Sequence, residues 1–165
     1  MEITGKIISG RGKANKNKRV FEIIAYLNVT YKIALVSGTL NLVTSKPYWL
    51  REDKAIFKSN DNKALVWDCE LNGNCCFIYR LVSMPAHVYE IISDIRLRDK
   101  YHLKDNDNVI INIPNEYIAI PNYSRVLYWH LFWKYREIHY YKSNYYVILL
   151  NKLFRYKSKY RTGTI

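Results

Sequence analysis

Thr39 and Asn41 carry side-chain oxygens and are separated by a single apolar residue in this 165-residue chain. In a β-strand, side chains at positions i and i+2 share one face, so both oxygens would point the same way while Leu40 and Leu42 enter the core. Two neutral oxygens on one face suit a hard cation that keeps its waters and binds phosphate oxygens, as Mg²⁺ does. The alternative interpretation is a polar outer face of a strand.

A glycine-rich turn with basic neighbours comes earlier in the chain. Glycines allow backbone N–H groups to approach an anion closely, and flanking cations add charge, so the turn is typical of a phosphate cradle. A plain hairpin connection is the alternative, because we expect no helix directly after the turn, as a dinucleotide fingerprint or a P-loop would require. The turn consists of Gly10, Arg11, Gly12, Lys13 and Ala14, and Lys16, Lys18 and Arg19 follow it.

A third pattern combines charged and apolar residues between residues 90 and 109. It contains Glu90-Ile91-Ile92, then Ile95-Arg96-Leu97-Arg98, then Leu103-Lys104-Asp105-Asn106-Asp107. We expect a helix from about residue 86 to residue 100, followed by a turn whose Asp and Asn residues tolerate left-handed conformations. The alternative is a solvated, charged surface.

Short strands must position these groups. The sequence predicts strands over residues 3–9, 20–27, 40–44, 64–69, 75–82 and 109–113, and Asn72-Gly73 predicts a tight hairpin turn. Many short strands with hairpin turns and one or two short helices favour a mainly β fold, a small closed barrel. Two Pro-Asn pairs near residues 114 and 121 divide the chain into a barrel at 1–114, a linker at 115–122 and a C-terminal extension at 123–165.

Charge is unevenly distributed over these regions. The chain carries a net charge of +12, and its extension contains nine basic residues against the single acid Glu137, a net +8 that leaves +4 for the rest. No apolar run is long enough to span a membrane, and no signal peptide is recognisable, so we expect a cytoplasmic protein. It could be peripheral at the inner face of the membrane.

The extension is rich in Trp and Tyr interspersed with Lys and Arg, and we expect it to be helical, with a break near residue 143. Such a composition suits an interfacial helix on an anionic membrane surface. It also suits helices that pack on the barrel or on a second copy of the chain, and less readily a nucleic-acid contact.

The three patterns occur in an order that resembles the archaeal CTP-dependent riboflavin kinases, over about residues 3 to 113. That family carries a Gly-x-Gly turn, then Gly-Thr-Leu-Asn, then Glu-Ile-Ile with Leu-Arg, then Leu-Lys-Asp-Gly-Asp. This chain has Gly10-Arg11-Gly12, Gly38-Thr39-Leu40-Asn41, Glu90-Ile91-Ile92 with Leu97-Arg98, and Leu103-Lys104-Asp105-Asn106-Asp107. The resemblance implies a compact cradle-loop β-barrel.

The resemblance also implies site residues. The family's Gly-turn positions would hold the CTP phosphates, its Thr and Asn would hold Mg²⁺, and its Glu would contact the acceptor. A family Thr aligns with Val82, and a one-residue shift would put Ser83 in its place. Carried onto this sequence, the nucleotide-binding residues are Gly10, Arg11, Gly12, Lys13, Ala14, Ile95, Arg96, Leu97 and Arg98, the metal ligands Thr39 and Asn41, and the acceptor-binding residues Glu90 and Ser83.

The implied activity is transfer of the γ-phosphoryl group of CTP to riboflavin, giving FMN, or to another alcohol. The alternative from a different class is a non-enzymatic barrel that binds nucleic acid through its basic surface.

Overall fold

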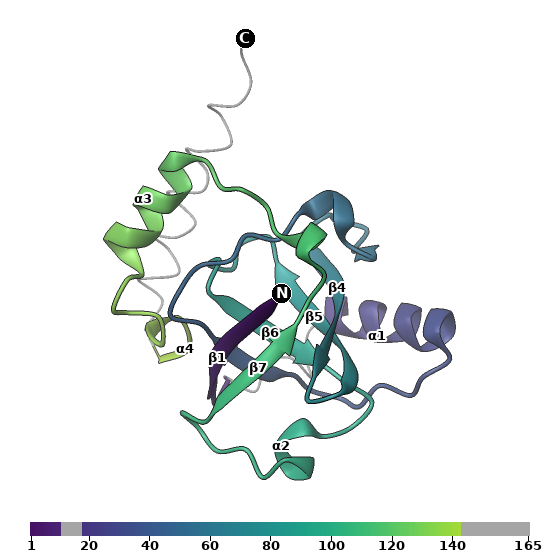
Figure 1. Cartoon of the computed structure of the whole chain (residues 1–165). Coiled ribbons are helices and arrows are strands. Elements are labelled where there is room, and N and C mark those ends of the chain that lie inside the picture. The colour runs from purple at the N-terminus through teal and green to yellow at the C-terminus, as the bar shows by residue number, and fades with distance from the viewer. Residues whose placement is uncertain (11–17, 143–165) are drawn as a thin grey trace.

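A closed antiparallel β-barrel of six strands dominates the computed structural model, which describes residues 1–10 and 18–142 (Figure 1). The strand order is β4-β5-β6-β2-β1-β7, and pairing of Glu70 with Asn112 and of Leu71 with Ile111 returns β7 to β4. The two-residue strand β3 (Phe57–Lys58) lies at the edge of β4. The barrel strands are β1 (Glu2–Ile8), β2 (Leu40–Val43), β4 (Ala64–Leu71), β5 (Asn74–Leu81), β6 (Val88–Ile92) and β7 (Asn108–Asn112). The predicted mainly β barrel is therefore confirmed.

Alternating side chains divide the apolar residues of the barrel into two clusters. One fills the interior and draws from all six strands, including Ile3, Leu42 and Tyr89, which are fully buried. The other lies on the outer face of β4, β5 and β6 and includes Val66 and Val88. This second cluster needs a cover, because apolar surface left in water costs free energy in proportion to its area.

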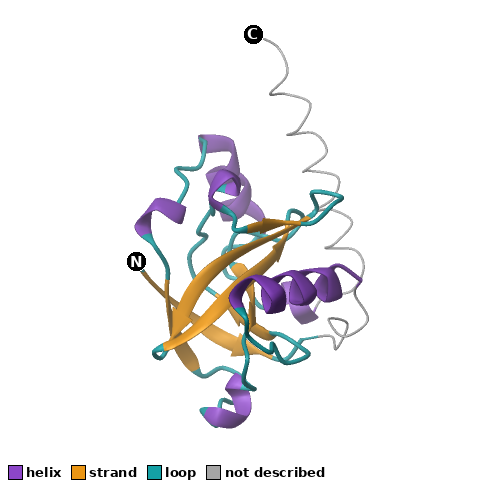
Figure 2. Ribbon diagram, turned by 90° about the vertical axis from the view of Figure 1, so that its right-hand side faces the viewer, coloured by secondary structure: helices purple, strands orange, loops and turns teal. Residues whose placement is uncertain are grey.

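Helix α1 (Lys18–Tyr31) provides that cover, lying across the outside of the barrel in Figure 2. The predicted strand over residues 20–27 is wrong. Val20, Ile23 and Leu27, the helix residues that are buried, are spaced by three and four residues, which is a helical period that a run of β-branched residues obscures in the sequence.

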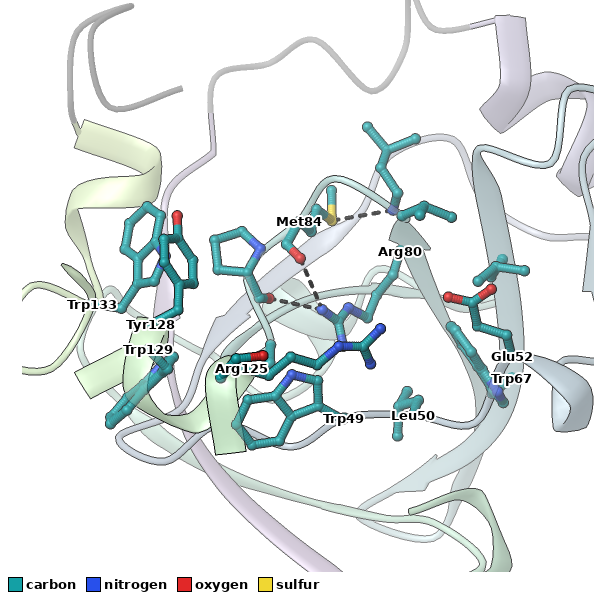
Figure 3. Close-up of a pocket in the computed structure, with 16 residues that line it drawn as sticks. Trp49, Leu50, Glu52, Trp67, Arg80, Met84, Arg125, Tyr128, Trp129 and Trp133 are labelled. Atoms are coloured by element: carbon teal, nitrogen blue, oxygen red, sulfur yellow. Dashed lines mark hydrogen bonds between the residues drawn. The ribbon is translucent and has the colours of Figure 1, made fainter. Parts of the chain in front are cut away.

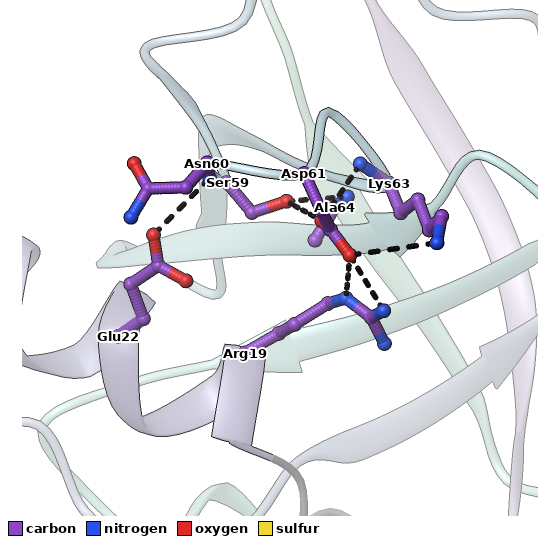
Figure 4. A network of polar contacts seen from close by, with 7 residues as sticks. All are labelled: Arg19, Glu22, Ser59, Asn60, Asp61, Lys63 and Ala64. Atoms are coloured by element: carbon purple, nitrogen blue, oxygen red, sulfur yellow. Dashed lines mark hydrogen bonds and ion pairs between the residues drawn. The ribbon is translucent and has the colours of Figure 1, made fainter.

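A polar network fixes the first turn of α1 to the turn between β3 and β4 (Figure 4). The Arg19 guanidinium donates through Nε and Nη2 to one carboxylate oxygen of Asp61, at 2.8 and 2.6 Å. The other oxygen of Asp61 accepts from the Ser59 hydroxyl at 2.7 Å, and the backbone N–H of Asn60 donates to Glu22. The Arg19 contact, followed by the Ser59 contact, holds the pKa of Asp61 well below its usual range. The start of the helix is thereby held against the barrel.

The predicted helix over residues 86–100 is also wrong for most of its length, since its first half contains strand β6 and only its last four residues are helical. Tyr89 and Ile91 point into the barrel, while Val88 and Ile92 pack under α1. A strand with both faces buried lacks the alternation of apolar and polar residues, so its sequence resembles a buried helix. Helical structure is confined to α2 (Leu97–Lys100).

The predicted hairpin at Asn72-Gly73 is confirmed. It joins β4 to β5, and its two central residues have φ values of 50° and 77°. A primed turn requires positive φ at both positions, which Asn tolerates and Gly adopts without strain.

Residues 115–142 pack against the barrel. A 3₁₀ turn (Asn115–Tyr117) buries Tyr117, and helices α3 (Tyr123–Phe132) and α4 (His139–Lys142) follow. The indole N–H of Trp129 donates to Nδ1 of the buried His87 at 3.0 Å. For these residues, packing on the barrel is the arrangement that the structure adopts. The break predicted near residue 143, and everything after it, lies outside the described residues.

Within residues 1–10 and 18–142, no helix has the length and apolar character needed to cross a membrane.

Candidate functional site

Three strands place the sequence-predicted polar residues side by side on the outer face of the barrel. Asn41 of β2 pairs with Ile8 of β1 on one side and with Glu90 of β6 on the other. Directly paired residues of antiparallel strands project from the same face. Residues far apart in the sequence are thus brought to one patch, where β1 ends and β2 begins.

Three side-chain oxygens converge in this patch. The Thr39 hydroxyl oxygen lies 3.4 Å from Oδ1 of Asn41 and 3.3 Å from Oε2 of Glu90. Asn41 is only 8% exposed. Burial raises the pKa of Glu90 to about 7, an effect that the hydrogen bond from Thr39 opposes in part. The convergent oxygens form a small, largely buried polar surface with one titratable carboxyl group.

Gly10 lies directly against the amide of Asn41. A Cβ atom at this position would collide with Nδ2 of Asn41 and would lie 3.0 Å from its Cγ. Any larger residue would therefore have to displace the Asn41 side chain. Glycine here allows the backbone to pack closely against the Asn41 side chain, which a residue with a Cβ atom could not do.

A second cluster fixes the chain that enters the glycine turn. The carboxylate of Asp105 accepts from the backbone N–H and the hydroxyl of Ser9, each at 2.9 Å. Arg98 of α2 donates to the same carboxylate at 2.9 Å. Hydrogen bonds from Ser9 and Arg98 lower the pKa of Asp105 against the opposing effect of its partial burial, so the carboxylate is held in its charged form. Neither Ser9 nor Asp105 is among the predicted site residues, although Asp105 belongs to one of the sequence motifs.

The predicted nucleotide-binding residues between positions 95 and 98 differ in their burial. Leu97 is 4% exposed and belongs to the interior cluster, and Ile95 packs against that cluster. Arg96 is exposed at the start of α2, and Arg98 pairs with Asp105. Side-chain contact with a ligand is consequently open to Arg96 and Arg98, whereas Ile95 and Leu97 support the segment from below.

Ser83 is not brought to this patch. It lies in the turn beyond the end of β5, past Leu81, whereas Glu90 pairs with Tyr79 further back along that strand. Arg11, Gly12, Lys13 and Ala14 lie outside the described residues. A helix does begin at Lys18, soon after the turn, contrary to the expectation that none follows it.

The oxygens of Thr39, Asn41 and Glu90 fit a magnesium ion by their chemistry. Mg²⁺ prefers oxygen ligands, takes one or two carboxylates, and completes its shell with water and phosphate oxygens. A group of three or more His, Cys, Asp or Glu side chains, which a transition metal would favour, does not occur in the described part of the chain.

Comparison with known proteins adds no further assignment. No protein-family model matches the chain, and a search of curated proteins finds no match.

Proposed function

We propose that this protein is a CTP-dependent kinase that transfers the γ-phosphoryl group to an alcohol acceptor, riboflavin or another, with Mg²⁺ as cofactor. One observation carries the proposal: Gly10, Thr39, Asn41 and Glu90, which come from three separate sequence motifs, meet in one patch. The choice of CTP as donor rests on the sequence resemblance described above.

Each residue has a role in this proposal. Thr39 and Asn41 would hold Mg²⁺, which would neutralise charge on the nucleotide phosphates, and Glu90 would face the acceptor hydroxyl. Gly10 allows the backbone that enters the glycine turn to lie directly against the Asn41 amide. Asp105 holds the chain entering the glycine turn, and Arg96, exposed at the start of α2, would contact the nucleotide.

The acceptor hydroxyl oxygen forms a bond to the γ-phosphorus of CTP, and the bond from that phosphorus to the β–γ bridging oxygen breaks. CDP leaves with the electron pair, and the hydroxyl proton passes to the Glu90 carboxylate. Positioning and charge neutralisation supply most of the rate in phosphoryl transfer, so these residues act mainly by holding the reactants in place.

The test is CDP formation by the full-length chain with CTP, Mg²⁺ and a panel of alcohols that begins with riboflavin. Asn41→Leu keeps the volume of the side chain but removes its oxygen, and it should lower transfer by about two orders of magnitude. Asn60→Leu is the matched control, because Asn60 is exposed in the turn between β3 and β4. A folded Asn41→Leu protein with wild-type transfer would reject the proposed site.

A second candidate function is nucleic-acid binding, which the net charge of +12 favours. Such binding would weaken steeply with salt and would not respond to Thr39→Ala. A kinase would instead respond to Thr39→Ala, and its binding of CTP would depend less steeply on salt.

A further inference from the structure

A cavity of about 300 Å³ lies between α3 and the end of the barrel where β5 ends and β6 begins. Val88, at the start of β6, pairs with Val43 at the end of β2, so this end is opposite to the one where Gly10 meets the start of β2. The cavity is therefore separate from the proposed kinase site.

Five aromatic side chains contribute to its walls. Figure 3 shows Arg80 in the middle, with Trp133, Tyr128 and Trp129 on one side and Trp67 and Glu52 on the other. The chain has four tryptophans, Trp49, Trp67, Trp129 and Trp133, and all of them line this cavity.

Arg80 places a positive charge in the cavity without a carboxylate partner in the described part of the chain. The residue is 8% exposed, and its Nη2 donates to the backbone carbonyls of Met84 and Pro85 at 3.2 and 2.8 Å. Its Nη1 donates to the carbonyl of Tyr48 at 3.4 Å, and its guanidinium carbon lies 5.2 Å from the centre of the Tyr89 ring. A buried guanidinium held only by carbonyl dipoles and a ring face keeps its full charge uncompensated, which costs free energy.

Two buried donors in the cavity lack an acceptor. Nε of Arg80 and Nε1 of Trp133 have no hydrogen-bond partner among residues 1–10 and 18–142. Buried N–H groups are nearly always paired in folded proteins, and an unpaired one indicates a missing partner. Burial lowers the pKa of Arg80, in keeping with a charge that has lost its water without gaining a carboxylate.

The other charged groups lining the cavity are Arg125 and Glu52, both exposed. With Arg80 they give two positive charges against one negative charge. The electrostatic balance of the cavity is thus positive.

We propose that this cavity binds a small planar anion, an aromatic ring that carries a carboxylate. The carboxylate would pair with the guanidinium of Arg80, and the ring would stack among the tryptophans and Tyr128. A volume of about 300 Å³ is at the lower end of the range for small-molecule sites, so a ligand of one or two rings fits and a nucleotide does not.

Tryptophan fluorescence tests the proposal directly, since every tryptophan of the chain lies at this cavity. The probes are benzoate, benzamide and cyclohexanecarboxylate, titrated into the full-length protein with excitation where none of them absorbs. Benzamide keeps the ring without the charge, and cyclohexanecarboxylate keeps the charge without the aromatic face. Benzoate should bind at least about tenfold more tightly than either. Equal affinity for all three, or no response to benzoate at millimolar concentration, overturns the proposal.

Arg80→Met removes the charge while keeping a long apolar side chain. Its melting temperature should stay the same or rise, because a buried charge without a counter-ion is lost, and benzoate binding should fall at least about tenfold. Arg96→Met at the opposite end of the barrel is the matched control and should leave benzoate binding unchanged. Benzoate binding that persists in folded Arg80→Met, or that is lost equally in Arg96→Met, contradicts the proposal.

Should Arg80→Met not fold, Tyr128→Leu on α3 keeps the proposal testable, because Tyr128 is only half-buried. It should reduce the preference for benzoate over cyclohexanecarboxylate at least about threefold. An unchanged preference would show that the ring face plays no part.

Discussion

His87 should make the stability of this protein fall in mild acid. Its imidazole is fully buried between the barrel and α3, and Nδ1 accepts from the indole N–H of Trp129. An indole nitrogen can only donate, so Nδ1 carries no proton, and Nε2 carries the proton and donates to the carbonyl of Glu137 at 3.2 Å. Protonating Nδ1 would set two donors against each other and break the contact that joins α3 to the barrel.

The magnitude follows from the pKa of His87. Burial lowers this pKa from 6.5 to about 3, the hydrogen bond to Glu137 opposes the shift, and the charge of Arg80 adds to it. Between pH 6.5 and pH 3 the unfolded chain binds a proton that the folded chain excludes, so the free energy of unfolding rises with pH in that window. The contribution is fully present above pH 6.5 and is lost by about 1.4 kcal/mol for each pH unit below it. Between pH 6.5 and pH 5 the loss is about 2 kcal/mol.

The assay is urea unfolding of the wild type and of His87→Asn at several pH values between 5 and 8. Asn keeps an oxygen that can accept from Trp129 but does not titrate, so subtracting the two free energies of unfolding removes the other titrating groups. The difference should change by about 1.4 kcal/mol per pH unit below pH 6.5 and should be level above pH 7. His130→Asn, which changes an exposed histidine on α3, is the control and should keep the wild-type slope. A difference that does not vary with pH, or that grows toward higher pH, would refute the reasoning.

Two further outcomes are expected. Gly73→Ala should lower the free energy of unfolding by about 1–2 kcal/mol, because φ at this position is +77° while no atom lies within 4 Å of the added methyl group, so backbone strain is the whole cost; an unchanged urea midpoint would show that the turn relaxes freely. Trp129→Ala should cost about 3–5 kcal/mol, since the indole is 5% exposed and its N–H pairs with His87; a loss below about 1 kcal/mol would mean that α3 is only loosely attached.

Strands with alternating apolar and polar residues could be predicted from the sequence, whereas helices and strands within uniformly apolar runs could not. β1 and the hairpin at Asn72-Gly73 follow from alternation and turn chemistry. β6 was mistaken for a helix because both of its faces are buried, and α1 for a strand because a run of β-branched residues obscures its helical period. Tertiary packing decides whether such a segment becomes a helix or a strand.

The candidate site, too, could be predicted from the sequence only in part. Thr39 and Asn41 share a face because they lie two residues apart, which the sequence alone shows. Their proximity to Gly10 and Glu90 depends on strand register, which follows from the whole barrel. The aromatic cavity had no local signal, since its tryptophans come from the segment before β3, from β4, from α3 and from the residue that follows α3. Arg80 reads in the sequence as an ordinary surface cation at the end of a strand.

Calorimetric titration of CTP into the full-length protein with Mg²⁺ tests the central claim most directly. The same titration is run with ATP, without Mg²⁺, and with Gly10→Ala, whose added methyl group would collide with the Asn41 amide. We predict Mg²⁺-dependent binding of CTP that is at least about tenfold tighter than that of ATP, the factor that 1.4 kcal/mol represents, and that is lost in a folded Gly10→Ala protein. CTP binding that needs no Mg²⁺, that equals ATP binding, or that is unchanged in Gly10→Ala would contradict the account.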